Sequence, residues 1–375
     1  MKTFNIAVIP GDGVGQETVP AAWRVLELAG QLSNAFAVRS HVFDWSCAYY
    51  QRHGHMMPDN GLDLLKPFDA IFLGAVGFPP VPDHVSLWGL LLPIRRGFDQ
   101  YINLRPIKLL RGITSPLCGY HPGDIDFVVI RENTEGEYSN SGGRLRVGTP
   151  QEVVVQNSVF TRFGTERVIR YAFNLARASR QSLTSATKSN GINFSMPFWD
   201  EVFQEVGEEY PDVKQVLYHI DALAAYFVTR PQTFDVVVGS NLFGDILTDL
   251  GAAIQGSIGI AASANINPEG QYPSMFEPVH GSAPDIAGKG LANPIGQIWT
   301  AKLMVDHLGF PDVGATILEA IERAWPKLRV QRPKAAWQQQ CPLPAAPPKS
   351  LTRQSQRPPQ VLQLSLSRCR TRLSP

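Results

Sequence analysis

The sequence has few cysteines and no long apolar run. Its four cysteines, Cys47, Cys118, Cys341 and Cys369, are scattered without C-x-x-C spacing, which indicates neither a zinc site nor a disulfide framework. The apolar run near the N-terminus is short and broken by Pro10, so it does not resemble a signal peptide, and no run approaches the length of a membrane span. These absences predict a reduced, cytoplasmic protein with no membrane partner.

Acidic residues and glycine are both missing from the last part of the chain. Residues 326–375 contain ten of the 34 Lys and Arg, nine of the 30 prolines, and no Asp, Glu or Gly. Such a composition does not build a core, so this basic tail is predicted to be disordered. Two explanations stay open, a natural basic extension and out-of-frame translation, and the complete lack of acid and glycine favours the second.

The rest of the chain is acidic, with 24 Lys and Arg against 33 Asp and Glu. It therefore offers no general basic face, and nucleic acid is not an expected partner. A length of 375 residues with 44% hydrophobic content is enough for two domains or one large one.

The stretch FDVVVGSNLFGDILTDL, residues 234–250, organises the chain. Its β-branched run predicts a strand buried on both faces, and Ser240 or Asn241 can cap the helix that follows. Asp245 and Asp249 lie four residues apart on one face of that helix. The plainer interpretation is a solvated acidic face, but the surrounding sequence is almost uncharged. Carboxylates in such a setting favour a site for Mg²⁺ or Mn²⁺.

Apolar strands and helices alternate along the remaining chain, which predicts an α/β architecture with ligands at the carboxyl ends of the strands. The turn Gly11 to Gly15 reads GxGxG and lacks the GxGxxG spacing of a dinucleotide fingerprint. It is weak evidence, so the cofactor is assigned elsewhere.

The segment NLFGDILTD resembles the metal-binding signature of the β-decarboxylating dehydrogenases, the family of isopropylmalate, isocitrate, tartrate and D-malate dehydrogenases. The resemblance extends from Ile6 to about Ile321. It implies a two-domain isopropylmalate dehydrogenase-like fold, with a central mixed sheet flanked by helices, rather than a Rossmann fold. The implied domains are 1–105 with 258–325 on the cofactor side, and 106–257 for metal binding and dimerisation, with an arm near 140–155.

The resemblance also implies substrate contacts. Arg95, Arg105 and Arg131 match the arginines that bind the two carboxylates of a malate-like substrate, and their forked donors suit that task. Trp88 and Leu91 match positions that select the substrate, and Trp88 in SLWG resembles the tartrate and D-malate branch. Pro93 departs from the pattern, because an interior proline should kink the helix expected over 87–101 or misplace Arg95.

A shared metal site follows from the same resemblance. Asp245 and Asp249 with Asp221 of the partner subunit would bind Mn²⁺ or Mg²⁺, and a requirement for K⁺ is left open. Lys188, also from the partner, would be the general base, and Tyr138 would protonate the enolate carbon. The active unit is therefore expected to be a homodimer.

The loop from Phe276 to Gly288, with the segment at 293–296, resembles the cofactor site of the family. Asp285 can accept both adenosine ribose hydroxyls and would repel a 2′-phosphate, which favours NAD over NADP. The expected cofactor-binding residues are Glu277, His280, Gly281, Ser282, Ala283, Asp285, Ile286 and Asn293.

These features predict NAD-dependent, metal-dependent oxidation of tartrate and oxidative decarboxylation of D-malate to pyruvate and CO₂. A 3-isopropylmalate dehydrogenase is the alternative enzyme. The unusual tail supports an alternative of another class, an inactive family member or a non-enzymatic binder.

Overall fold

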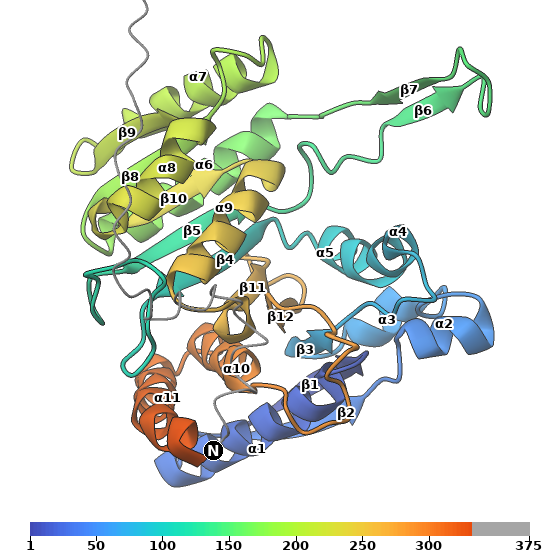
Figure 1. The fold of residues 1–375 in the computed structure, drawn as a ribbon, viewed down its shortest axis with the longest axis vertical. Coiled ribbons are helices and arrows are strands. Elements are labelled where there is room, and N and C mark those ends of the chain that lie inside the picture. The colour runs from blue at the N-terminus through green and yellow to red at the C-terminus, as the bar shows by residue number, and fades with distance from the viewer. Residues whose placement is uncertain (332–375) are drawn as a thin grey trace, which may run out of the picture.

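The computed structural model describes the backbone of residues 1–331 and the side chains as far as Trp325. A mixed sheet of ten strands runs through the molecule in the order β2-β1-β3-β12-β11-β4-β5-β10-β8-β9, with helices against it (Figure 1). The mixed α/β architecture expected from the sequence is confirmed. The expectation of disorder over 332–375 lies outside the described residues.

The strands that form this sheet, and the two-stranded arm, have the following bounds: β1 Lys2–Gly11, β2 Phe36–Val42, β3 Ala70–Ala75, β4 Ile102–Lys108, β5 Asp126–Glu132, β6 Gly142–Leu145, β7 Val153–Gln156, β8 Ser182–Thr187, β9 Lys214–His219, β10 Val236–Gly239, β11 Ala262–Ile266 and β12 Ser274–Pro278. Antiparallel pairing is confined to the middle of the sheet, where β11 pairs with β12 and β4, and β4 pairs with β5. All other neighbours in the large sheet are parallel. The sheet is therefore two parallel halves joined at an antiparallel centre.

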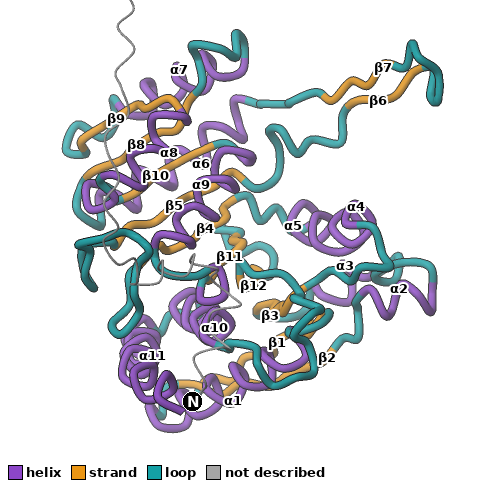
Figure 2. The backbone as a smooth tube through the Cα atoms, in the orientation of Figure 1, coloured by secondary structure: helices purple, strands orange, loops and turns teal. Residues whose placement is uncertain are grey.

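The helices, shown in Figure 2, have these bounds: α1 Gly15–Ser33, α2 Cys47–His53, α3 Gly61–Leu65, α4 Asp83–Ser86, the π-helical turn η1 Leu87–Leu91, α5 Leu92–Gly97, α6 Arg162–Arg177, α7 Ser195–Gly207, α8 Ile220–Thr229, the 3₁₀ turn η2 Pro231–Thr233, α9 Asn241–Ile254, the 3₁₀ turn η3 Ile258–Ile260, α10 Ile295–His307 and α11 Pro311–Gln331. The backbone of α11 continues past Trp325 into the segment that the sequence assigns to the tail. Within the described residues, no helix is both long and apolar enough to cross a membrane.

The strand β10 and the helix α9 lie where the sequence places them. All four residues of β10 are buried, as a β-branched run between two parallel neighbours requires. Ser240 is the N-cap residue of α9, but its side chain makes no capping hydrogen bond. The carboxylate of Glu137 caps the helix instead, because it accepts from the Leu242 N–H at 3.0 Å and from the Ser240 hydroxyl at 2.7 Å. The expected side-chain cap from Ser240 or Asn241 is therefore wrong.

The single helix expected over 87–101 is also wrong, because Pro93 divides it. A proline ring collides with the carbonyl four residues earlier in a regular α-helix. The chain avoids this collision by widening into the π turn η1, after which α5 restarts with Pro93 in its first turn, where a missing N–H costs nothing. Arg95 is thus buried on a regular helix rather than displaced.

Strands β6 and β7 form an arm that projects away from the body of the molecule (Figure 1). Every residue in both strands is exposed, including Leu145 and Val154. The segment expected as an arm is therefore a separate hairpin. The division of the body into two domains stays a prediction, and the sheet is continuous across the predicted boundary because β4 pairs on both sides.

Candidate active site

Asp245, in the second turn of α9, lies at the centre of the site. Its Oδ2 accepts a hydrogen bond of 2.9 Å from the Tyr138 hydroxyl, and its Oδ1 accepts from Arg131 Nη1. Arg105 Nη1 lies 3.4 Å from the same Oδ1. Burial disfavours the charged carboxylate, but the two guanidinium groups outweigh it, and the pKa of Asp245 lies below its usual range. Asp245 is therefore ionised at neutral pH.

Asp249 follows one helical turn later and is more exposed, with 60% of its side-chain area accessible. Its Oδ1 lies 3.9 Å from Arg105 Nη1. Partial burial, opposed by Arg105 and supported by the nearby Asp245 charge, raises the pKa of Asp249. The two carboxylates thus share one face of α9, as predicted, and provide hard oxygen donors of the kind that Mg²⁺ and Mn²⁺ prefer.

Three elements bring the predicted arginines together: Arg95 comes from α5, Arg105 from β4 and Arg131 from the end of β5. All three are buried, and Arg105 donates to Thr248 Oγ1 at 2.6 Å. The Nε atoms of Arg95 and Arg105 are buried without a hydrogen-bond partner in the described chain. Burial, together with the neighbouring Arg105 charge, lowers the pKa of Arg131 to about 10. The cluster is therefore a concentrated positive site with unused donors, which suits a carboxylate ligand.

Asn241 holds the Arg131 side chain in place. Its Oδ1 accepts from Arg131 Nε at 3.0 Å and from Nη2 at 2.7 Å. The sequence argument treated Asn241 only as a capping residue, and Thr248 was not considered. Both residues lie within the SNLFGDILTD stretch, so their position in the metal-binding signature could have identified them as site residues.

Glu277 is a cofactor-binding residue by resemblance, and in the structure its carboxylate contacts Arg95 and Asn265. Its Oε1 accepts from Arg95 Nη2 at 2.5 Å and from Asn265 Nδ2 at 2.8 Å. Both members of the Arg95–Glu277 pair are buried, with side chains 7% and 9% exposed. Asn265 continues into a buried amide network with Asn103 and Asn133, each donating to its Oδ1. Glu277 therefore positions Arg95, a role that the sequence argument missed.

Lys188 and Asp221 form a pair apart from this cluster. Lys188 Nζ, at the end of β8, donates to Asp221 Oδ1 at 3.0 Å, and this bond lowers the pKa of Asp221. Within residues 1–331 no three His, Cys, Asp or Glu side chains are grouped so as to hold a metal ion. One chain thus does not bring Asp221 to the two carboxylates of α9, and its proposed role in the partner's site stays a prediction.

The predicted cofactor loop connects β12 to α10. Ser282 is buried, and its carbonyl accepts from the Val14 N–H at 2.8 Å, while Ala283 has a positive φ of 41°. Gly281 has open space where a side chain would project, within the described residues. His280 Nε2 is buried with no partner in the described residues, and burial lowers the pKa of His280. These are features of a loop whose backbone and side chains are available to a ligand.

The remaining loop residues differ in exposure. Asp285 is exposed, and its carboxylate makes no hydrogen bond within the described chain, although its carbonyl accepts from Lys289. Ile286 is half-buried, and its N–H donates to the Ala283 carbonyl. Asn293 is buried and its Oδ1 accepts from the Ile295 N–H at 3.1 Å, at the start of α10.

The glycine-rich turn after β1 supports this loop rather than opening to a ligand. A Cβ on Gly13 would lie 2.1 Å from the Ser282 carbonyl oxygen, and Gly13 has a φ of 53°. The Asp12 carboxylate accepts from the Cys47 and Gly77 N–H groups. The interpretation of this turn as something other than a dinucleotide fingerprint is consistent with its packing.

The predicted substrate-selecting residues lie in the π turn η1. Trp88 is partly exposed at 36%, whereas Leu91 is buried. The Arg96 guanidinium lies 4.7 Å from the centre of the Trp88 ring, and Arg96 Nη2 donates to the Tyr138 carbonyl at 2.6 Å. Arg96 was not among the predicted site residues.

The structure thus combines a mixed α/β sheet with buried arginines beside the ionised Asp245, an arrangement suited to binding a small anion. The sequence matches the isocitrate/isopropylmalate dehydrogenase family over residues 5–331. The chain belongs to this family and is an oxidoreductase by that membership. The resemblance seen in the sequence is thus confirmed.

Several known proteins are similar to this chain in sequence or in structure. A probable tartrate dehydrogenase/decarboxylase of Bacillus subtilis (strain 168) is 62% identical over 324 residues, which is 86% of this chain and 91% of the relative. The D-malate dehydrogenase [decarboxylating] of Escherichia coli (strain K12) is 57% identical over 330 residues, again 86% and 91%. Among solved structures, isocitrate dehydrogenase from Methylococcus capsulatus superposes with a TM-score of 0.78 at 34% identity, covering 86% of this chain and 91% of that one.

Proposed function

We propose that the protein is an NAD-dependent and divalent-metal-dependent dehydrogenase that oxidises tartrate and oxidatively decarboxylates D-malate to pyruvate and CO₂. The observation that carries this proposal is the convergence of Arg105, Arg131 and Tyr138 on the ionised Asp245. Such a site combines anion binding, a metal-binding carboxylate and a proton donor. The named activities of the relatives from B. subtilis and E. coli support it.

The substrate is held by the three arginines. Arg95, Arg105 and Arg131 approach from separate elements, so together they can fix a dicarboxylate in one orientation. The buried, unpartnered Nε atoms of Arg95 and Arg105 are donors that a carboxylate would satisfy. Because the arginines are desolvated, each such charge-assisted hydrogen bond is stronger than it would be on the surface.

Asp245 and Asp249, with Asp221 of the partner subunit, would hold Mg²⁺ or Mn²⁺. When bound, the ion supplies Lewis acidity to the substrate hydroxyl and to the negative charge that develops on its oxygen. The two guanidinium groups beside Asp245 lower its pKa, which favours the ionised form that a metal ligand requires. We leave K⁺ outside the proposal.

The protein's own groups move two protons. Lys188 of the partner subunit would take the proton of the C2 hydroxyl, and NAD, when bound, would supply the acceptor for the C2 hydride. The bond from C3 to the distal carboxyl then breaks, CO₂ departs, and its electron pair stays as an enolate. Tyr138 donates its hydroxyl proton to C3, and burial beside Asp245 raises the pKa of Tyr138, which keeps it protonated until then.

NAD would lie along the loop from His280 to Asn293. The exposed Asp285 carboxylate would accept the ribose hydroxyls and would repel a 2′-phosphate. Gly281, Ser282, Ala283 and Ile286 would present the backbone to the cofactor. Glu277 has a different proposed role, since its carboxylate is already committed to Arg95.

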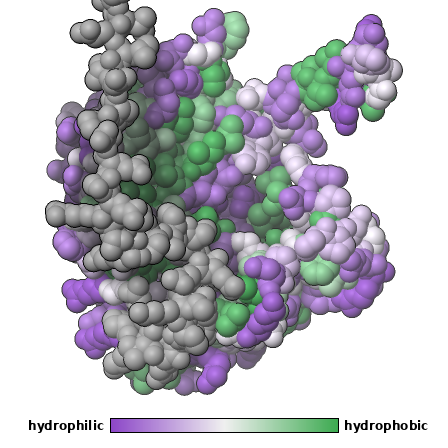
Figure 3. All heavy atoms as spheres, in the orientation of Figure 1, coloured by the Kyte–Doolittle hydropathy of each residue, from purple (hydrophilic) through white to green (hydrophobic). Residues whose placement is uncertain are grey.

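A homodimer is proposed as the active unit. Hydrophobic side chains gather over α8 and α9 (Figure 3), where Val228 and Ile246 are 39% and 54% exposed. The arm adds exposed Val153 and Leu145. Unpaired apolar surface of this kind favours a partner. A second copy would also bring Lys188 and Asp221 to the carboxylates of α9, which one chain does not do.

Trp88 supports the tartrate and D-malate branch. Its ring stacks on Arg96 and is partly exposed, and it would limit the bulk tolerated at C3 of the substrate. A 3-isopropylmalate dehydrogenase is the second candidate, because Leu91 provides an apolar neighbour in the same turn.

The test is NADH formation by the purified chain with Mn²⁺, comparing D-malate, the tartrate isomers, 3-isopropylmalate and isocitrate, each with and without EDTA. We expect chelator-sensitive turnover of D-malate and tartrate, with NADP a poor substitute for NAD. Asp249→Asn should abolish the response to Mn²⁺, and Asp312→Asn, at the start of α11, is the matched control. A higher kcat/KM for 3-isopropylmalate would refute the substrate assignment, and turnover unaffected by EDTA would refute the metal requirement.

A further inference from the structure

Arg96 connects two parts of the proposed site that are distant in the sequence. Its guanidinium stacks on Trp88, 4.7 Å from the ring centre, and its Nη2 donates to the backbone carbonyl of Tyr138 at 2.6 Å. Trp88 belongs to the turn η1, which carries the proposed substrate-selecting residues. Tyr138 belongs to the loop that carries the proposed proton donor. The side chain is half-buried, so both contacts are partly shielded from water.

The π turn makes this stacking possible. In a regular α-helix, residues 88 and 96 are eight apart, about two and a quarter turns, so their side chains would point roughly 80° away from each other. The wider turn of η1 takes up one extra residue, which returns Trp88 and Arg96 to the same face. Because Pro93 prevents a regular helix here, it sets the register that places the tryptophan ring over the arginine.

The Tyr138 loop depends on contacts of this kind. It joins β5 to the arm and contains no regular secondary structure between Glu132 and Gly142. Glu137, the residue before, is tied to the start of α9, and Ser139, the residue after, donates to the Asn157 carbonyl. Arg96 supplies the hydrogen bond to the backbone carbonyl of Tyr138 itself.

We propose that Arg96 is a positioning residue for Tyr138, with Trp88 as its support and Pro93 as the cause of their alignment. The inference rests on the proposed function for its kinetic meaning, because Tyr138 is the proposed proton donor. Arg96 fixes the position and orientation of the Tyr138 backbone. The Tyr138 hydroxyl then lies where it bonds to Asp245 and would face the substrate carbon. Arg96 is not catalytic, because its own contacts are with protein.

The first experiment does not require activity. The protein is labelled with 3-fluorotyrosine, and the ¹⁹F resonances of Tyr138 and Tyr210 are assigned with the Tyr138→Phe and Tyr210→Phe variants. Arg96→Lys, which keeps the charge but loses the planar stack, should shift and broaden the Tyr138 resonance. Arg177→Lys is the matched control, because Arg177 stacks on Tyr210 at 4.2 Å and pairs with Asp212. It should move the Tyr210 resonance and leave Tyr138 unchanged.

The second experiment concerns the reaction. If Arg96 positions the proton donor, Arg96→Lys should lower kcat on D-malate about 10- to 100-fold with little change in KM. The solvent deuterium isotope effect on kcat should rise, since protonation of C3 becomes slower than hydride transfer. In a Tyr138→Phe background, Arg96→Lys should have no further effect. A merely structural role would instead reduce activity equally in both backgrounds.

The outcomes are separable. An unmoved Tyr138 resonance, or equal kinetic losses in both backgrounds, overturns the inference. If the unmodified chain turns over none of the substrates, the proposed function fails, and the ¹⁹F comparison still decides the positioning role. If Arg96→Lys does not fold, Pro93→Ala decides the question: it keeps all three side chains, and the inference requires the Tyr138 resonance to move as the helix becomes regular.

Discussion

The buried pair between Arg95 and Glu277 allows a quantitative separation of folding from function. Glu277 Oε1 accepts from Arg95 Nη2 at 2.5 Å and from Asn265 Nδ2 at 2.8 Å, with both charged side chains less than a tenth exposed. Glu277→Leu leaves the buried Arg95 guanidinium without its counterion. It also leaves one hydrogen of the Asn265 amide without an acceptor, since the remaining contact of Nδ2 is the Met275 carbonyl at 3.3 Å. The uncompensated charge should cost about 3–5 kcal/mol, and the amide about 1–3 kcal/mol more.

The double variant Arg95→Met with Glu277→Leu should recover most of this loss. It removes the buried charge entirely and leaves only one hydrogen of the Asn265 amide without an acceptor, so we expect about 3–5 kcal/mol to return relative to Glu277→Leu alone. Arg95→Met by itself should be less harmful than Glu277→Leu, because a carboxyl can take up a proton and still accept from Asn265. Activity should not recover with stability in the double variant, because both variants without Arg95 lose a proposed substrate contact.

Urea unfolding monitored by far-UV circular dichroism measures these differences as changes in midpoint at constant slope. The matched control is Glu319→Leu, which breaks the exposed Glu319–Arg323 pair of α11, where the side chains are 56% and 77% exposed. It should change the free energy of unfolding by about 1 kcal/mol or less. A double variant no more stable than Glu277→Leu would refute the assignment of Glu277 as the counterion of Arg95.

Two further predictions concern folding and reactivity. Burial, with the nearby Asp12 charge, raises the pKa of Cys47 from 9.0 to about 12. A disulfide reagent at pH 8 should therefore label the exposed Cys118 in the native protein and Cys47 only after unfolding. Because the native thiol holds its proton more tightly than the unfolded one, Cys47 stabilises the fold below pH 9, and that contribution is lost as the pH rises toward 12. Gly13→Ala should lower the melting temperature and weaken NAD binding, measured by thermal unfolding and fluorescence titration, since its Cβ would meet the Ser282 carbonyl at 2.1 Å, whereas Gly143→Ala in the open arm should change neither.

Local patterns in the sequence predicted the elements that bear the site. The Val-rich run and the acidic pair of α9 lie within seventeen consecutive residues, so periodicity alone indicates a buried strand followed by a helix with two carboxylates on one face. The arm near 140–155 was expected from resemblance to the family, and the structure shows a hairpin there. Resemblance to the family then identified Arg95, Arg105 and Arg131, which the structure brings to the same place.

The contacts that the sequence did not predict join residues far apart along the chain. Arg95 and Glu277 are 182 positions apart, and their pairing follows from the sheet order that places β12 beside β3 and β11. Glu137 caps α9 across 105 positions, replacing the local cap that the sequence favoured. The π turn was missed for another reason: a proline indicates a break in the helix, but the sequence does not say how the backbone resolves it.

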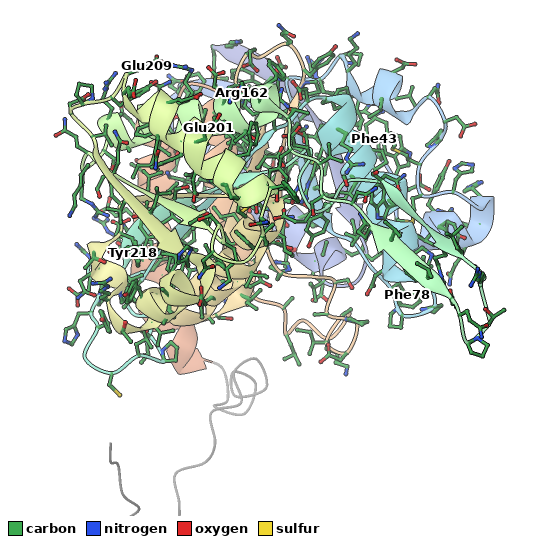
Figure 4. The ribbon with its side chains drawn as sticks, turned by 90° about the horizontal axis from the view of Figure 1, so that it is seen from above. Phe43, Phe78, Arg162, Glu201, Glu209 and Tyr218 are labelled. Atoms are coloured by element: carbon green, nitrogen blue, oxygen red, sulfur yellow. The ribbon has the colours of Figure 1, made fainter. Side chains whose placement is uncertain are left out.

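Exposed ion pairs differ from the buried Arg95–Glu277 pair and contribute little to the specificity of the fold. Arg162, at the start of α6, pairs with Glu201 and Glu205 of α7, and Figure 4 shows Arg162 and Glu201 together on the outer face of these helices. About half of each side chain remains exposed, so the contribution to stability is small. The buried pairs differ because neither partner can be removed without leaving a desolvated charge.

The balance of charge explains why the proposed cation and dicarboxylate belong together. Arg95, Arg105 and Arg131 are matched in the protein by Glu277, Asp245 and Asp249, so the buried cluster is close to neutral. A dicarboxylate alone would add two negative charges beside the carboxylates of α9, and a divalent cation alone would add two positive charges beside three guanidinium groups. Bound together they restore neutrality, so each should raise the affinity of the other by the same factor. Loss of turnover on adding EDTA would therefore reflect weaker substrate binding as well as missing Lewis acidity.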